Sequence, residues 1–259
     1  MRHYGLIGER LGHSLSVPIH EAIFRRLGID ADYRLIELSR DGLAEGVRGL
    51  LTTLDGFNVT IPYKEAVIPL LKSLSPEAQA IGAVNTVEAG GRNVGHNTDA
   101  GGFAAMLCHH GMNPADRPAY VLGTGGAAKA ARAALDAMGA RVTMVSRRPG
   151  AEAIGYDELA ARLRAGGGYL INATPVGMWP QVDGCPVDEA ILPYAEGVAD
   201  MIFNPRQTRL TRAAQEAGVP ACTGLYMLVA QAVAAEEIWQ GRRMPDGLTD
   251  DVMKELNGQ

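Results

Sequence analysis

Residues 119–128 read AYVLGTGGAA. The apolar start of this stretch predicts a buried strand, and the alanine-rich run after it predicts a helix as far as Met138. Glycines at the spacing G-x-G-x-x-A permit a tight turn and let backbone N–H groups approach a pyrophosphate at the helix N-terminus. A glycine-rich turn without a ligand has the same composition, but a strand before it and a helix after it favour a dinucleotide-binding domain. The cofactor-binding residues predicted here are Gly123, Gly125, Gly126 and Ala127.

The identity of the dinucleotide is indicated by the end of the next predicted strand, Arg141 to Val145. An NAD site usually has an acidic residue about 20 positions after the glycines, where it binds the ribose hydroxyls. The strand is instead followed by Ser146, Arg147 and Arg148, with no acid. Two arginines can bind a 2′-phosphate through paired hydrogen bonds. We therefore predict that the cofactor is NADP.

The composition narrows the class of protein. A chain of 259 residues suggests one large or two ordinary domains. With 47% hydrophobic and 20% charged residues it has the composition of a soluble globular protein. A net charge of -5 argues against general nucleic-acid binding, because there is no basic stripe to neutralise phosphates. The sequence contains no apolar run long enough for a membrane span, and its N-terminal apolar run is too short for a signal peptide. We therefore expect a cytoplasmic protein.

Three cysteines, Cys108, Cys185 and Cys222, are widely spaced and form no CxxC pair. Neither a disulfide framework nor a zinc site is indicated by this spacing. Free thiols in a reducing compartment are the simpler expectation.

The first hundred residues alternate between predicted strands and helices, which indicates a first α/β domain ending near Asp99. A strand is predicted in the stretch NVTIPYK, residues 58–64, because Val59 and Ile61 alternate with polar residues. The proline at position 62 should end the strand and open a helix continuing to Leu71, with Lys64 in its first turn.

Lys64 and Asp99 have ordinary interpretations when each is considered alone. An exposed lysine is most often a solvated surface residue, and an aspartate before a helix is most often an N-cap. A lysine and an aspartate that meet across a cleft, however, form a proton-transfer pair.

The stretch NVTIPYK, followed later by NTD at residues 97–99, resembles the shikimate dehydrogenase family. In that family N-V-T-x-P-[FY]-K carries the catalytic lysine, here Lys64, and N-T-D carries its aspartate partner, here Asp99. The resemblance covers seven motifs between Tyr4 and about Gly241. It implies reversible NADPH-dependent reduction of 3-dehydroshikimate to shikimate, a step of aromatic amino-acid biosynthesis, by a monomer or homodimer.

The same resemblance implies an α/β fold of two domains with the active site in the cleft between them. Residues 1–99 and 225–259 would form the substrate-binding catalytic domain, and residues 100–224 a Rossmann doubly wound NADP-binding domain. By this resemblance the substrate would be bound by Ser14, Ser16, Thr60, Asn85, Phe203 and Gln231. The cofactor would be bound in addition by Thr174, Met201 and Gly224.

Two departures from the family pattern keep other substrates open. Pro18 lies one place late in HSLSVPIH, residues 13–20, where the family has H-S-x-S-P-x-x-H. Phe203 stands where the family commonly has a tyrosine, and losing that hydroxyl should weaken carboxylate binding by about 1–3 kcal/mol. Whether Tyr226 supplies the missing hydroxyl is left open by the sequence.

The nearest alternative is therefore a quinate/shikimate dehydrogenase or an aminoshikimate-type relative, with NAD as a possible cofactor. An alternative from another class is a dinucleotide-binding regulatory module without catalysis. Retention of both Lys64 and Asp99 argues against that module and equally against a structural protein with an unused fold.

Overall fold

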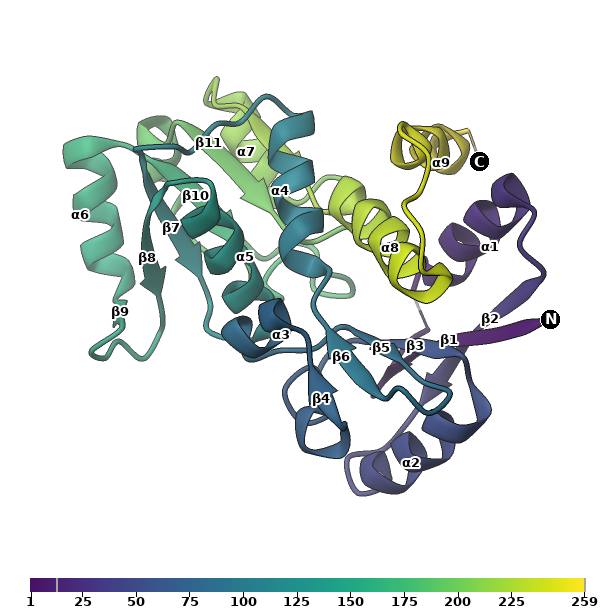
Figure 1. Ribbon diagram of the computed structural model, residues 1–259. Helices are drawn as coiled ribbons and strands as arrows, with labels where there is room; N and C mark the ends of the chain where they lie inside the picture. The colour runs from purple at the N-terminus through teal and green to yellow at the C-terminus, as the bar shows by residue number, and fades with distance from the viewer. Residues whose placement is uncertain (13, 259) are drawn as a thin grey trace. The chain divides into compact units, whose positions relative to one another are not determined.

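The computed structural model describes residues 1–12 and 14–258, and the chain separates into two compact units (Figure 1). Unit 1 consists of Met1–Asp99 together with Val229–Gln259, and unit 2 consists of Ala100–Leu228. The N-terminal unit is therefore completed by the last segment of the chain.

Unit 1 is built on a six-stranded sheet with the order β2-β1-β3-β5-β6-β4. β1 pairs in parallel with β2 and β3, whereas β5 pairs antiparallel with β3 and β6. The hairpin between β5 and β6 contains Gly90 and Gly91, both with positive φ. The strands of unit 1 are β1 Arg2–Gly8, β2 Ala31–Glu37, β3 Gly56–Val59, β4 Ser73–Leu74, β5 Thr86–Glu88 and β6 Val94–His96.

Apolar side chains alternate along β1 and reach a core on each face of this sheet. Tyr4 and Leu6 pack in a cluster that contains Phe24 of α1 and touches Trp239 of α8, whereas Ile7 packs in a second cluster with Val47 of α2. The helices of unit 1 are α1 Ser16–Leu27, α2 Leu43–Thr53, the short 3-10 helix η1 Ile68–Leu70, α3 Pro76–Ile81, α9 Leu248–Asn257 and most of α8, Leu225–Gln240.

The α-helix predicted after Pro62 is wrong. β3 ends at Val59, Ile61 is 62% exposed, and the chain runs through turns to the 3-10 helix η1. Pro69 lies inside η1. A second proline so soon after the first removes another N–H donor and obstructs the i→i−4 pattern, so no α-helix can propagate here. Lys64 therefore lies in a turn rather than in a helix.

Unit 2 has a six-stranded sheet with the order β12-β11-β10-β7-β8-β9, and all five pairings are parallel. Numbered within the unit, this order is that of a Rossmann domain, which reverses direction at β7. The Rossmann prediction is thus confirmed. The strands are β7 Pro118–Leu122, β8 Arg141–Val145, β9 Ala153–Ile154, β10 Tyr169–Asn172, β11 Gly197–Asp200 and β12 Ala221–Thr223.

Helices cover both faces of this sheet, because buried residues form a separate cluster on each side. Phe103 of α4 and Ala131 of α5 belong to one cluster, and Leu159 of α6 and Leu210 of α7 belong to the other. The helices of unit 2 are α4 Asp99–His109, α5 Gly126–Ala137, α6 Tyr156–Gly166, the 3-10 helix η2 Glu189–Tyr194 and α7 Arg209–Glu216. Two helices cross the boundary between the units: the first residue of α4 is counted in unit 1, and the first turn of α8 is counted in unit 2. Among the described helices, none is long and apolar enough to cross a membrane.

Candidate functional site

Lys64 and Asp99 are in direct contact. The Lys64 Nζ lies 2.5 Å from the Asp99 Oδ2, and the two side chains are only 16% and 7% exposed. Asp99 is the first residue of α4, and the turn that carries Lys64 is tied to the chain before β5 because the Lys64 carbonyl accepts a hydrogen bond from Val84 N at 2.7 Å. The two groups are thus held together as a charge-assisted pair with limited access to water.

Asn85 completes the surroundings of the carboxylate. Its Nδ2 donates to the Asp99 Oδ1 at 3.0 Å and to the Thr98 Oγ1 at 2.9 Å, while its Oδ1 accepts from the Thr98 N at 2.7 Å. The Gln231 Oε1 lies 3.4 Å from the same Asn85 Nδ2. Both carboxylate oxygens therefore have donors, one from Lys64 and one from Asn85, an arrangement that suits an ionised carboxylate beside an ammonium.

The two serines of the N-terminal motif also lie together. The Ser14 Oγ donates to the Ser16 Oγ at 3.1 Å and accepts from the Ser16 N at 3.1 Å. The N-cap of α1 is Leu15, which makes no side-chain cap hydrogen bond, so Ser16 does not occupy the cap position. Ser16 is instead the first helical residue, and its hydroxyl is left to hydrogen-bond other groups beside the helix N-terminus, where an anion is favoured.

A chain of hydrogen bonds links this serine pair to Asp99 through a residue that sequence reasoning missed, Tyr33 of β2. Its hydroxyl donates to the Asn58 Oδ1 at 2.7 Å and also hydrogen-bonds Ser16, and burial nevertheless raises the Tyr33 pKa well above its usual value. The Asn58 Nδ2 donates to the carbonyl oxygen of Asn85 at 3.1 Å. Tyr33 carries no local motif, so only the pairing of β1 with both β2 and β3 could have revealed it.

Thr60 follows β3 directly. Its backbone N–H donates to the Ile7 carbonyl at 2.9 Å, and its hydroxyl has no hydrogen-bond partner among the residues that the structure describes. The hydroxyl is thus available to a ligand.

In unit 2 the glycine-rich turn has the geometry that a pyrophosphate requires. Gly123 has φ +109°, and a Cβ at this position would lie 3.1 Å from the Ala173 carbonyl oxygen. Gly125 is the N-cap of α5, whose first two residues are Gly126 and Ala127, and as a glycine it has no side chain to cap the helix. Backbone N–H groups at the start of α5 therefore stay available to an anion, so these residues fit a dinucleotide.

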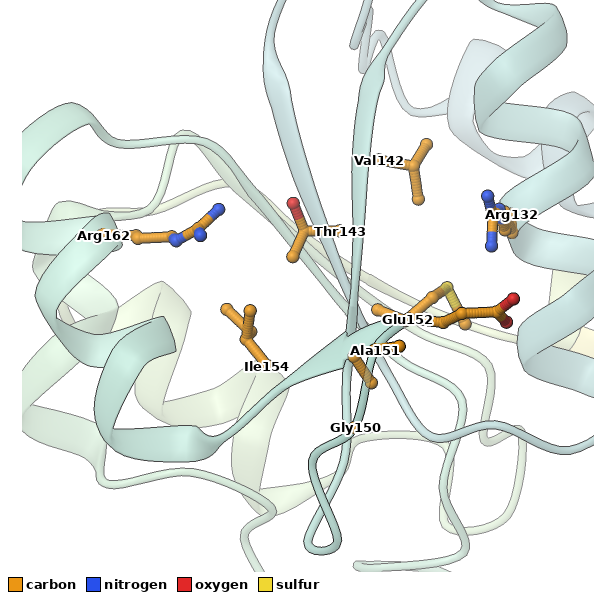
Figure 2. Close-up of a pocket in the computed structure, with 10 residues that line it drawn as sticks. Arg132, Val142, Thr143, Gly150, Ala151, Glu152, Ile154 and Arg162 are labelled. Atoms are coloured by element: carbon orange, nitrogen blue, oxygen red, sulfur yellow. The ribbon is translucent and has the colours of Figure 1, made fainter.

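The turn after β8 is basic. Arg147 and Arg148 are both exposed, and the Arg148 N donates to the Ser146 Oγ at 3.1 Å. A hollow lies along β8 and β9, and Figure 2 draws the residues that line it, among them Arg132 and Arg162. Its volume is about 220 Å³, and its lining does not include Arg147 or Arg148. Both lining arginines are engaged with acidic residues of their own helices. The hollow is therefore not assigned to the cofactor.

Three further predicted cofactor residues are tied together at the carboxyl ends of β10, β11 and β12. The Thr174 N and Oγ1 donate to the Asn172 Oδ1 at 3.0 and 2.7 Å, and the Met201 N donates to the Asn172 carbonyl at 3.0 Å. Gly224 follows β12, and a Cβ on it would lie 2.2 Å from the Met201 carbonyl oxygen. The segments after β11 and β12 thus lie so close together that there is no space for a side chain at Gly224.

Phe203 lies in the partly buried segment that follows β11 in unit 2. The ring of Tyr226, the candidate for supplying the hydroxyl absent at Phe203, stacks on His109 with centroids 3.9 Å apart. The three cysteines are free, and the described residues contain no group of three or more His, Cys, Asp or Glu that could hold a metal ion.

Comparisons with known proteins find relatives that match along nearly the whole chain. A family model described as the shikimate dehydrogenase substrate binding domain matches residues 6–87. A shikimate dehydrogenase (NADP(+)) from Clostridium beijerinckii is 40% identical over 258 residues, which cover 96% of each chain. The crystal structure of shikimate dehydrogenase 1 from Peptoclostridium difficile is 36% identical with a TM-score of 0.91, covering 99% of this chain and 98% of that one.

A shikimate 5-dehydrogenase from Thermus thermophilus has been crystallised in complex with NADP(H) and shikimate. It is 32% identical to this chain with a TM-score of 0.88, and the match covers 98% of this chain and 99% of that one.

Proposed function

The chain belongs to the shikimate dehydrogenase family, and from that premise we propose that it catalyses the reversible NADP-dependent conversion of shikimate to 3-dehydroshikimate. The observation that carries the proposal is the contact between the Lys64 ammonium and the Asp99 carboxylate, to which Asn85 also donates a hydrogen bond. The reaction is a step in the supply of aromatic amino acids.

The proposed chemistry divides between the bound cofactor and Lys64. NADPH, when bound, supplies the hydride that reduces the substrate carbonyl. The carbonyl oxygen gains negative charge during the reduction, and Lys64 stabilises it and donates the proton. Asp99 holds the amine in position by accepting its hydrogen bond, in a site that is mostly closed to water. In the oxidation of shikimate the step runs in reverse, and the neutral amine of Lys64 accepts the hydroxyl proton.

Unit 1 would bind the substrate. The hydroxyls of Ser14 and Ser16, beside the N-terminus of α1, suit the substrate carboxylate, since they can donate two hydrogen bonds without adding charge. Thr60, Asn85 and Gln231 lie in the same unit and suit the ring hydroxyls.

Unit 2 would bind NADP. The start of α5 suits the pyrophosphate, and Arg147 and Arg148 suit the 2′-phosphate. Thr174, Met201 and Gly224 lie at the carboxyl ends of the neighbouring strands, where the nicotinamide half of a dinucleotide is expected. All of these residues belong to one chain, so either a monomer or a homodimer can carry out the reaction. We propose that the enzyme acts in the cytoplasm.

A second candidate is a dehydrogenase that accepts quinate as well as shikimate. The specific observation in its favour is Phe203, which has no hydroxyl for a substrate carboxylate. Steady-state assays with shikimate and with quinate, each with NADP and with NAD, separate the candidates. The first candidate is supported when only the pair of shikimate and NADP is turned over. The second is supported when kcat/KM for quinate is comparable to kcat/KM for shikimate.

Substitution of Lys64 tests the mechanism. Lys64→Ala should lower kcat by about 10²–10⁴-fold and change KM little, because proton donation is made in the transition state. Lys72→Ala is the matched control, since this lysine of unit 1 is exposed and its Nζ donates to the Gly91 carbonyl. Turnover by Lys64→Ala at the rate of the control would remove Lys64 from the chemistry.

A further inference from the structure

Two polar residues at the ends of neighbouring strands are fully buried, and the proposed chemistry uses neither of them. Asn172 ends β10 and Asp200 ends β11, and the two residues are register partners in the parallel pairing. Both are 0% exposed. A fully buried carboxylate is costly unless hydrogen-bond donors compensate for the loss of water. The donors around Asp200 therefore show which segments it holds in place.

Asp200 accepts hydrogen bonds from three different segments of unit 2. Its Oδ1 accepts from the Asn172 Nδ2 at 3.0 Å and from the Ile202 N at 3.1 Å. Its Oδ2 accepts from the Thr208 Oγ1 at 2.8 Å, and Thr208 is the N-cap of α7. One carboxylate therefore connects the end of β10, the segment after β11 and the start of α7.

Asn172 extends these connections to the predicted cofactor residues. Its Nδ2 donates to Asp200 and, at 3.2 Å, to the Val176 carbonyl, so both amide protons are engaged and its Oδ1 must face the other way. That Oδ1 accepts both the N–H and the hydroxyl of Thr174. Asp200 thereby fixes the orientation of the amide that holds Thr174.

The position of this cluster in the sheet indicates which part of the cofactor it serves. The strand order reverses at β7, and a dinucleotide lies across the carboxyl ends of the strands at such a point. The basic turn with Arg147 and Arg148 follows β8, on one side of β7, which leaves β10 and β11 on the other side for the nicotinamide half.

We propose that Asp200 is a positioning residue for the nicotinamide half of the NADP site. It sets the loops that carry Thr174 and Met201, through Asn172 and through the backbone N–H of Ile202. This inference rests on the proposed function, because it assumes that unit 2 binds NADP.

The chemistry of the three donors determines which substitutions are tolerated. Asparagine at position 200 can accept from Asn172 and Ile202 with its Oδ1 and donate to the Thr208 hydroxyl with its Nδ2. Alanine leaves these donors without an acceptor in a buried place. The conservative Asp200→Asn variant should therefore keep the loops in position, whereas Asp200→Ala should release them.

The test compares the full cofactor with a fragment that lacks the nicotinamide. Binding of NADP and of 2′,5′-ADP to the full-length protein is measured by calorimetry. Asp200→Ala should weaken NADP binding at least about tenfold, or about 1.4 kcal/mol, and leave 2′,5′-ADP binding within about twofold. Asp200→Asn should bind both like the parent.

Asn172→Ala gives a second route to the same result, because it breaks the connection to Thr174 and leaves Asp200 two of its three donors. It should show the same selective loss of NADP binding even where Asp200→Ala fails to fold. Thr211→Ala is the matched control: this buried residue of the α7 capping box bonds Thr208 but does not touch Asn172, so it should weaken neither ligand selectively.

Equal loss of NADP and 2′,5′-ADP binding in Asp200→Ala and in Asn172→Ala would overturn the proposal, because it would show a general structural role. Unchanged NADP binding in a folded Asp200→Ala or Asn172→Ala protein would overturn it as well. The proposed function fails separately, when the parent protein binds no NADP or does not turn over shikimate.

Discussion

Replacing Asp200 by asparagine should change how the stability of unit 2 depends on pH. Burial raises the pKa of Asp200 from 3.8 to about 6, although the hydrogen bonds from Thr208, Ile202 and Asn172 act in the opposite direction. The folded protein therefore keeps a proton on this carboxyl at pH values where the unfolded chain has already released it. Asparagine has no proton to release, so the variant lacks this contribution.

The sign and size of the effect follow from the two pKa values. Below about pH 3 both states are protonated at Asp200, so the group adds no pH dependence. As the pH rises from about 4 to 6 the unfolded state binds fewer protons than the folded state, and the free energy of unfolding falls. A difference of about two pKa units corresponds to about 3 kcal/mol over the whole transition, of which about 2 kcal/mol falls between about pH 4.5 and 7.5. The parent should lose this amount relative to Asp200→Asn.

Urea unfolding at several pH values between about 4.5 and 7.5 measures the difference. The chain has two tryptophans, and Trp179 lies in unit 2 whereas Trp239 lies in unit 1, so fluorescence can report on both units. The neighbouring thiols do not titrate in this range, because burial raises the pKa of Cys222 to about 12 and also raises that of Cys185.

Asp136→Asn, which removes an exposed carboxylate of α5, is the control for a surface charge in the same unit. The reasoning is refuted when the stability difference between Asp200→Asn and the parent varies by less than about 1 kcal/mol across this pH range. An increase of the parent's stability relative to the variant as the pH rises would reverse the sign and refute it more directly.

Three further predictions concern the site. Tyr33→Phe leaves the buried Asn58 Oδ1 without its donor, so unit 1 should lose about 1–3 kcal/mol in urea unfolding, and the KM for shikimate should rise while that for NADP stays unchanged. Gly224→Ala should weaken NADP binding in calorimetry, because a Cβ would lie 2.2 Å from a backbone carbonyl oxygen. Replacing Arg147 and Arg148 together by alanine should lower kcat/KM for NADP relative to NAD by at least about tenfold, through loss of charge-assisted bonds to the 2′-phosphate.

Each of these predictions has a matched control in the same unit or on the same sheet. Tyr4→Phe removes another largely buried hydroxyl of unit 1, which bonds Gln240 and not the chain of hydrogen bonds through Tyr33. Gly101→Ala adds a Cβ into open space on α4, and Arg132→Ala removes an exposed arginine that pairs with Asp136. Equal effects of a variant and its control would contradict the corresponding prediction.

The parts of the fold that sequence could predict are those set by local chemistry. The turn at Gly123 needs a positive φ and has a strand and a helix on either side, so it identifies the Rossmann unit by itself. Ser75 accepts from the Ala78 N and caps α3, and Gly90 and Gly91 form the turn of a hairpin. In each case the signal lies within a few residues.

What sequence could not predict depends on distant pairings or on competing local signals. Tyr33 and Asn58 lie on strands separated by β1, and their hydrogen bond exists only because β1 pairs with both. Asp200 ends an apolar strand, and its importance depends on Asn172 opposite it. The expected helix after Pro62 failed because Pro69 interrupts the same short segment.

The assembly of unit 1 from both ends of the chain has a consequence for synthesis on the ribosome. Unit 2 is continuous from Ala100 to Leu228 and can fold once it has emerged, whereas unit 1 must wait for Val229–Gln259. Until then the face formed by Tyr4, Phe24 and Tyr33 lacks its neighbour Trp239. A nascent chain that stalls before this segment exposes an apolar surface to chaperones and proteases. Incomplete chains are therefore recognised and degraded because part of their core is uncovered.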